Sequence, residues 1–90
     1  MYVPTRLRVL RIKYKITLKV LAGRMNISNQ HLSRMELADI PPTEYHERLL
    51  CLGMERLLVE WDGAPEELKQ EYQTYRGRLL QPAKEVEDER

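Results

Sequence analysis

The sequence predicts an all-α protein, a small bundle of five or six helices, and three observations support this. Its 90 residues fit one small domain, and 42% hydrophobic with 32% charged residues is ordinary for a globular chain. Hydrophobic residues recur at helical spacing along most of the chain. Prolines, glycines and an asparagine fall between these segments, where turns are expected. Together these features favour short helices joined by tight turns.

The first helix is expected to begin after Thr5, whose side chain suits an N-cap, and to end near Tyr14. Leu7, Leu10 and Tyr14 recur at the spacing of one helical face. The next window, IKYKITLKV (residues 12–20), alternates apolar and polar residues as a half-buried strand does. The alternation stops on both sides, however, and no second alternating run could provide a partner strand. The window therefore indicates a helix end, a short connection and a new helix.

Two short helices joined by a tight turn follow, at about residues 18–25 and 29–37. Thr17 and Ser28 are suited to cap their N-termini. Asn26 tolerates the left-handed conformation that ends helices, so it can reverse the chain between them. Six apolar residues are expected to face the core from these two helices: Leu18, Leu21, Ala22, Met25, Leu32 and Met35.

Two further helices are expected in the second half of the chain. Thr43 follows a proline pair and can cap a helix that ends near Trp61, with Gly53 as a point where it could split. The inner stripe expected for this helix comprises Tyr45, Leu49, Leu52, Leu57 and Trp61, with Leu50, Met54 and Leu58 alongside. A last helix is expected at residues 65–80, with an apolar stripe of Leu68, Tyr72, Tyr75 and Leu79. The acid-rich tail at residues 82–90 has little to bury and is expected to be disordered.

Charge is distributed unevenly along the chain. Residues 1–36 hold eight basic residues against one acidic residue, a net charge of +7, whereas residues 37–90 hold seven against thirteen, a net charge of −6. A basic first third is expected of a surface that binds a polyanion. It is equally compatible with a solvated face that only keeps the protein in solution.

Several classes of protein are not expected. No window approaches the roughly 18 apolar residues of a membrane span, and the N-terminus lacks the apolar core of a signal peptide. Cys51 is the only cysteine, so we expect a small buried side chain, without a disulfide framework or a metal cluster, in a reducing cytoplasm. His31 and His46 lack metal-ligand spacing, and we see no phosphate loop. The sequence therefore predicts no catalytic residues, no metal, no cofactor and no enzyme activity.

The segment ITLKVLAGRMNISNQHLSRME, residues 16–36, resembles the Cro/repressor-type helix-turn-helix of the XRE family. The matching residues are Thr17, Leu21-Ala22, Asn26, Ile27-Ser28, Leu32-Ser33-Arg34 and Glu36, with Arg11 and Pro42 outside the segment. The resemblance covers about residues 5–60 and implies a lambda-repressor-like DNA-binding domain at residues 1–61. Residues 62–81 then form an extra C-terminal helix that packs on the core or dimerises.

With Leu32 and Met35 turned inward, the third helix is expected to present four polar residues outward: Asn29, Gln30, Ser33 and Arg34. Asn and Gln amides can bond adenine edges, and an Arg guanidinium can bond guanine. The resemblance implies that residues 29, 30 and 34 read bases and that Thr17 and Ser28 contact phosphate. Lys19, Arg24 and Lys13 are expected to add sequence-independent attraction to phosphate.

Other residues of the motif favour structural roles. The resemblance implies that Arg11 pairs with Glu36, and we expect this ion pair to support the fold. His31 is expected to lie on the flank of the third helix. Trp61, Tyr72 and Tyr75 are expected to pack rather than to stack on bases.

The chain departs from the family pattern at several positions. Lys15 stands where glycine often turns the chain, so that turn is expected to be strained by about 1 kcal/mol or built differently. Leu18 replaces a common phosphate-contacting glutamine, and Ala38 replaces a common glycine. Asp39 and the prolines after it supply neither positive charge nor backbone donors for phosphate on that side of the motif.

The sequence thus predicts a bacterial or phage-type transcriptional regulator, such as a repressor, that binds double-stranded DNA through residues 29–37. A homodimer is expected, formed through the helix that ends at Trp61 or through the apolar stripe of the last helix, in the cytoplasm and on the nucleoid when bound. The alternative is a protein-interaction module on the same fold, either an antitoxin or an accessory subunit of a mobile element's DNA-processing complex.

Overall fold

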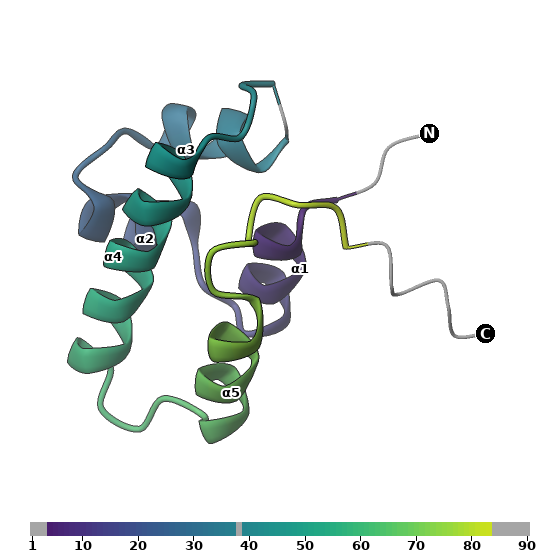
Figure 1. The fold of residues 1–90 in the computed structure, drawn as a ribbon. Helices are drawn as coiled ribbons and strands as arrows, with labels where there is room; N and C mark the ends of the chain where they lie inside the picture. The colour runs from purple at the N-terminus through teal and green to yellow at the C-terminus, as the bar shows by residue number, and fades with distance from the viewer. Residues whose placement is uncertain (1–3, 38, 84–90) are drawn as a thin grey trace.

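A computed structural model describes residues 4–37 and 39–83 and contains five α-helices in that part of the chain. The helices are α1 (Arg6–Lys13), α2 (Leu18–Met25), α3 (Asn29–Glu36), α4 (Glu44–Glu60) and α5 (Glu66–Tyr75). Within these ranges there is no β-strand, only an isolated bridge between Thr5 and Pro82. In Figure 1, α4 lies across α2 and α3, and α5 lies beside α1. The predicted all-α bundle is confirmed.

Four of the five helices begin at a side-chain cap. Thr5, Thr17, Ser28 and Thr43 each accept a hydrogen bond from the backbone N–H three residues on, at 3.1–3.2 Å. Each bond satisfies one of the free N–H groups at the start of a helix. Short polar residues at these four positions therefore set where the helices begin, as the sequence predicted.

Two non-glycine residues adopt the left-handed backbone conformation. Asn26 (φ 62°) ends α2, and Lys15 (φ 59°) turns the chain between α1 and α2. Lysine lacks the local side-chain hydrogen bonding that helps asparagine here, so its turn carries about 1 kcal/mol of strain. The alternating window at residues 12–20 thus folds as the end of α1, a turn and the start of α2.

Gly53 does not split α4, although the sequence had marked it as a point where the helix could split. The helix runs unbroken through Gly53, and a Cβ there would overlap Cγ of Met25 on α2. Glycine is therefore needed because α2 and α4 approach closely at this point.

The inner stripe of α4 also differs from the expected one. Leu50, Met54 and Leu57 are buried, whereas Tyr45 and Leu52, which were expected inside, are 62% and 46% exposed. The cause is that α4 carries apolar residues around most of its circumference, so periodicity alone could not choose its inner face.

The last helix ends at Tyr75, five residues before the predicted end at Leu80. Gly77 (φ 85°) then turns the chain, and Leu79 and Leu80 enter the core from a non-helical segment. Their backbone N–H groups donate to the carboxylate of Glu47 at 3.0 and 2.8 Å. In a helix that continued to Leu80, both N–H groups would bond to carbonyls four residues back, so this segment follows the tertiary contacts rather than the apolar spacing.

The C-terminal segment also completes the start of α1. Arg6 N–H donates to Gln81 O and Leu7 N–H donates to Leu79 O, both at 2.8 Å. These N–H groups would otherwise lack an intrahelical partner. Residues 79–83 therefore belong to the folded unit; residues 84–90 of the expected disordered tail, and Ala38, lie outside the described residues.

One core joins all five helices and the C-terminal segment. Its fully buried side chains include Leu7, Leu10, Leu21, Leu32, Met35, Leu50, Met54, Leu68, Tyr72 and Leu79. The Tyr72 hydroxyl donates to Glu55 Oε2 at 2.8 Å, and burial together with this bond raises its pKa well above the ordinary value of 10.0. Cys51 is half-buried, not buried as expected. No helix in the described ranges is long and apolar enough to cross a membrane.

Candidate nucleic-acid interface

The pair α2 and α3 is held by small and aliphatic side chains. Ala22 of α2 is fully buried, and its carbonyl accepts a hydrogen bond from Ile27 N–H at 3.1 Å in the turn between the helices. Leu32 and Met35 of α3 are 0% and 2% exposed. Since both inward positions lie on one side of an eight-residue helix, the opposite side of α3 must face solvent.

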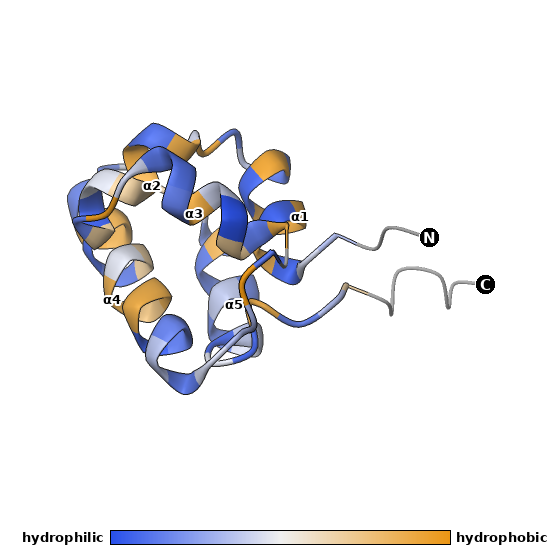
Figure 2. Cartoon of the chain, turned by 90° about the horizontal axis from the view of Figure 1, so that it is seen from above, coloured by the Kyte–Doolittle hydropathy of each residue, from blue (hydrophilic) through white to orange (hydrophobic). Residues whose placement is uncertain are grey.

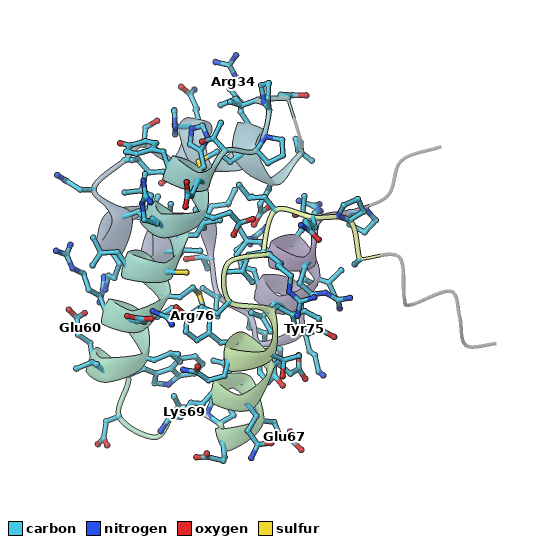
Figure 3. The ribbon with its side chains drawn as sticks, viewed as in Figure 1. Arg34, Glu60, Glu67, Lys69, Tyr75 and Arg76 are labelled. Atoms are coloured by element: carbon cyan, nitrogen blue, oxygen red, sulfur yellow. The ribbon has the colours of Figure 1, made fainter. Side chains whose placement is uncertain are left out.

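That outer side carries the polar residues expected there. Asn29, Gln30 and Arg34 are exposed, whereas Ser33 is half-buried. Arg34 projects away from the body of the protein in Figure 3, and the ribbon around α3 in Figure 2 is mainly hydrophilic. No carboxylate in the described part of the chain pairs with the Arg34 guanidinium. Two amides and one unpaired guanidinium therefore stand on one accessible helix face.

A hollow of about 490 Å³ lies beside this face. Its lining residues include Gln30, Ser33, Arg34, Leu37 and Asp39. Asp39 is exposed and places a negative charge at one side of the hollow. A negative charge at this place would repel phosphate on that side of α3.

The N-termini of α2 and α3 and one lysine of α2 are exposed, and this lysine has no ion-pair partner in residues 4–37 or 39–83. Thr17 and Ser28 are exposed caps, and the first N–H groups of α2 and α3 beside them have no partner within their helices. Lys19 is exposed near the first of these N-termini. Such groups suit an anion because the N–H groups and the helix dipole both favour negative charge.

Two of the three basic residues expected to attract phosphate are ion-paired: Lys13 Nζ lies 2.6 Å from Glu71 Oε2, and a carboxylate of α4 holds Arg24. Its Nη2 lies 2.7 Å from Glu60 Oε1 at the end of α4. Its backbone carbonyl accepts a hydrogen bond from Arg56 at 3.2 Å. The positive charge of Arg24 is therefore partly neutralised, and its contribution to phosphate binding is smaller than the sequence suggested.

A buried ion pair fixes the C-terminal end of α3 against α1. The Arg11 guanidinium binds both carboxylate oxygens of Glu36, with Nη2 to Oε1 at 3.0 Å and Nε bonded to Oε2. The Glu36 side chain is 0% exposed, and Arg8 Nη1 lies 3.5 Å from Oε1. Arg11 Nη1 also donates to Ile16 O at 3.0 Å. Sequence reasoning found the pair but missed Arg8 and Ile16, which only the packing of α1 brings close.

His31 lies on the flank of α3 against the start of α4. Its ring centroid is 6.1 Å from that of His46, and His46 Nδ1 lies 2.9 Å from Thr43 Oγ1. No metal-binding group of three or more such residues occurs in the described ranges. Sequence spacing gave no signal for the His31–His46 contact, because the two residues are fifteen positions apart.

No protein-family model, no curated protein and no solved structure matches this chain. The geometry described above is therefore the basis for a functional conclusion.

Proposed function

We propose that this protein binds double-stranded DNA sequence-specifically by placing α3 in the major groove. The observation that carries the proposal is the exposed face of α3, with Asn29, Gln30 and Arg34 over a buried Leu32 and Met35. Amide and guanidinium groups can bond two atoms of adenine and guanine, respectively, in the major groove. On this proposal the protein is a transcriptional regulator of the XRE type that acts by occupying an operator.

Phosphate contacts would set the orientation of α3 in the groove. The N-termini of α2 and α3, capped by Thr17 and Ser28, are exposed, and Lys19 adds a positive charge that no carboxylate among the described residues pairs with. Contacts of this kind position a protein on DNA without reading its sequence. They also make the affinity for DNA fall steeply as salt is added. The reason is that binding releases counterions from the DNA, and added salt opposes this release.

One helix as short as α3 makes few contacts with DNA. A twofold dimer would double them by binding two half-sites about 34 Å apart. Leu68, Tyr72 and Leu79 of the last apolar stripe are fully buried within the monomer, which argues against that stripe as the dimer surface. The outer face of α4 remains, with Leu52 46% and Val59 85% exposed. A shallow hollow of about 270 Å³ lies between these two residues, which suits an apolar side chain from a second copy.

The central test is selection of bound sequences from a random duplex library, followed by two variants. Arg34→Ala should weaken the selected site by roughly 1–3 kcal/mol and relax the preference at one base pair. Lys19→Ala should instead weaken all duplexes alike and reduce the salt dependence. Lys69→Ala is the matched control, because Lys69 and Arg34 lie at opposite ends of the molecule (Figure 3). Unchanged selection by Arg34→Ala would refute the role of α3.

A protein-interaction module on the same fold is the second candidate. It is favoured by the exposed Asp39 beside α3 and by the partial neutralisation of Arg24 by Glu60. Titration with a random duplex at low salt separates the two candidates. Strong binding that weakens steeply with salt supports DNA binding, whereas no binding at low salt supports an antitoxin or an accessory subunit.

A further inference from the structure

A groove separate from the outer face of α3 lies between the connection of α1 to α2, α2 itself and the end of α4. Its volume is about 540 Å³, within the range of roughly 300–1,000 Å³ that holds small ligands. The walls are mainly apolar and include Tyr14, Val20, Leu57 and Trp61. Val20 is 38% exposed, so an apolar surface in the groove faces solvent. The groove can therefore take a compact apolar group, and the two aromatic side chains favour a flat ring.

One polar group in this groove has an unfilled hydrogen-bonding position. Arg24 lines the groove, and its Nε is buried without a hydrogen-bond partner in the described structure. Its Nη2 contacts a single oxygen of Glu60 at 2.7 Å. Arg11 shows the complete arrangement in the same molecule, since its Nε and Nη2 bind both oxygens of Glu36. The Nε–Nη2 edge of Arg24 is thus only half used, and because Nε is covered by the protein, a carboxylate can bind the whole edge only when Glu60 turns away.

The charges around the groove favour an anion over a neutral ligand. Lys15 lies at the groove and is exposed, and no carboxylate in residues 4–37 or 39–83 pairs with it. Glu60 is the opposing charge, but its side chain is 54% exposed and can turn towards solvent when another carboxylate takes Arg24. We infer that the groove is a binding site for a small aromatic carboxylate, with its ring against Trp61 and its acid group on Arg24.

Occupancy of this groove would affect DNA binding, a consequence that rests on the proposed function. Thr17 and Arg24 line the groove and are also expected phosphate contacts. A bound carboxylate would compete with phosphate for Arg24 and place a negative charge near the N-terminus of α2. The ligand would therefore act as a negative effector of DNA binding.

Binding can be measured on the full chain because Trp61 is its only tryptophan and gives a single indole N–H signal in NMR. The probe is 1-naphthaleneacetate, and its neutral analogue 1-naphthaleneethanol is the matched ligand. The acid should shift the Trp61 signal saturably and bind about tenfold more tightly than the alcohol, as expected for a charge-assisted bidentate bond. No saturable shift, or equal affinity for acid and alcohol, would overturn the site.

Two variants assign the acid group. Arg24→Gln should remove the preference for the acid and leave binding of the alcohol unchanged. Glu60→Gln should strengthen binding of the acid several-fold, because it removes the competing carboxylate from an exposed position. Lys69→Gln, which changes a charge on α5 at a residue that does not line the groove, should alter neither affinity. Equal effects of Arg24→Gln on both ligands, or weaker binding of the acid by Glu60→Gln, would contradict the assignment.

The regulatory consequence has a separate measurement. Adding the acid should reduce affinity for a duplex, whereas the alcohol at equal occupancy should not. Unchanged affinity for DNA would overturn the effector role. It would not affect the ligand site, because the NMR titration tests that site independently of DNA. A protein that binds the acid but no duplex under any condition would instead contradict the proposed function.

Discussion

At the scale of single residues, the carboxylate of Glu36 is a charge buried in the core of the described residues. Its side chain is fully buried, and its charge is balanced by Arg11 and, more distantly, by Arg8. A buried charge is acceptable only while its partner remains, because it has given up its hydration. The pair also holds the end of α3, so the proposed DNA-reading face depends on a residue that cannot touch DNA.

Removing one partner of this pair should be costly. Arg11→Ala should lower the free energy of unfolding by about 3–5 kcal/mol, because Glu36 is left charged and buried. Arg8→Ala is the control and should cost about 1 kcal/mol or less, since Arg8 is 36% exposed and 3.5 Å away. Urea unfolding followed by circular dichroism measures both values. Equal losses of stability for the two variants would show that Arg11 is not the main residue that balances the charge of Glu36.

At the scale of helices, the contact between α2 and α4 depends on a missing side chain. Gly53 lets the two helices approach, and Met25 fills the space beside it. Helical periodicity marked Gly53 only as a weak point, because sequence spacing does not tell how close a neighbouring helix lies.

Two glycine variants separate close packing from helix propensity. Gly53→Ala should destabilise the protein by about 1–3 kcal/mol, because the new Cβ overlaps Met25 and the core must shift. Gly23→Ala, in α2 with no atom within 4 Å of its new Cβ, should instead stabilise by about 0.5–1 kcal/mol. Thermal unfolding of both variants tests the difference in sign, and stabilisation by Gly53→Ala would refute the close approach.

The contact between α1 and α5 is partly electrostatic and therefore depends on pH. Lys13 Nζ lies 2.6 Å from Glu71 Oε2, and the Tyr14 hydroxyl donates to the same oxygen at 3.0 Å. Desolvation opposes ionisation of Glu71, but hydrogen bonds from Lys13 and Tyr14 outweigh it and lower the pKa below 4.5. Ionised Glu71 therefore stabilises the fold above pH 4.5, and this contribution is lost as pH falls through the lower folded-state pKa.

Glu71→Gln should consequently make the free energy of unfolding depend less on pH in the acid range. The difference from the unmodified protein should be at most about 1 kcal/mol at neutral pH, because the contact is partly exposed. It should shrink towards zero well below pH 4.5. Urea unfolding over this pH range is the measurement. A difference that grows as pH falls would have the wrong sign and would exclude this role for Glu71.

At the scale of the whole molecule, the outer face of α4 is an exposed apolar surface on which the proposed dimer would form. Tyr45, Leu52 and Val59 recur every seven residues along this face and are 62%, 46% and 85% exposed. Residues seven positions apart lie in one line along a helix, as they do at the contact between the two helices of a coiled coil. The proposed dimer would bury this line and could present two copies of α3 to successive turns of DNA.

A paired substitution tests the dimer without disturbing the monomer. Leu52→Lys with Val59→Lys should abolish association measured by sedimentation equilibrium, because both side chains would carry charge into the proposed dimer contact. Stability of the monomer should change by no more than about 0.5 kcal/mol, as is usual for exposed positions. Lys69→Glu, on exposed α5 surface, should leave association intact. A variant that still dimerises would place the interface elsewhere.

The sequence by itself determined the helix boundaries near the N-terminus and the residues available to the candidate site. Thr5, Thr17, Ser28 and Asn26 act through local hydrogen bonding and backbone preference, so they could be read without knowing the fold. The polar face of α3 was equally readable, because Leu32 and Met35 fix which side is buried.

Only the tertiary structure decided which face of α4 is inner, where α5 ends, and that Arg24 is half engaged by Glu60 in an apolar groove. These features come from contacts between residues far apart in the chain, and a helix with apolar residues around most of its circumference gives no local signal of them. Local chemistry therefore fixed the elements at the start of the chain, whereas close packing fixed the surfaces that remain open to partners.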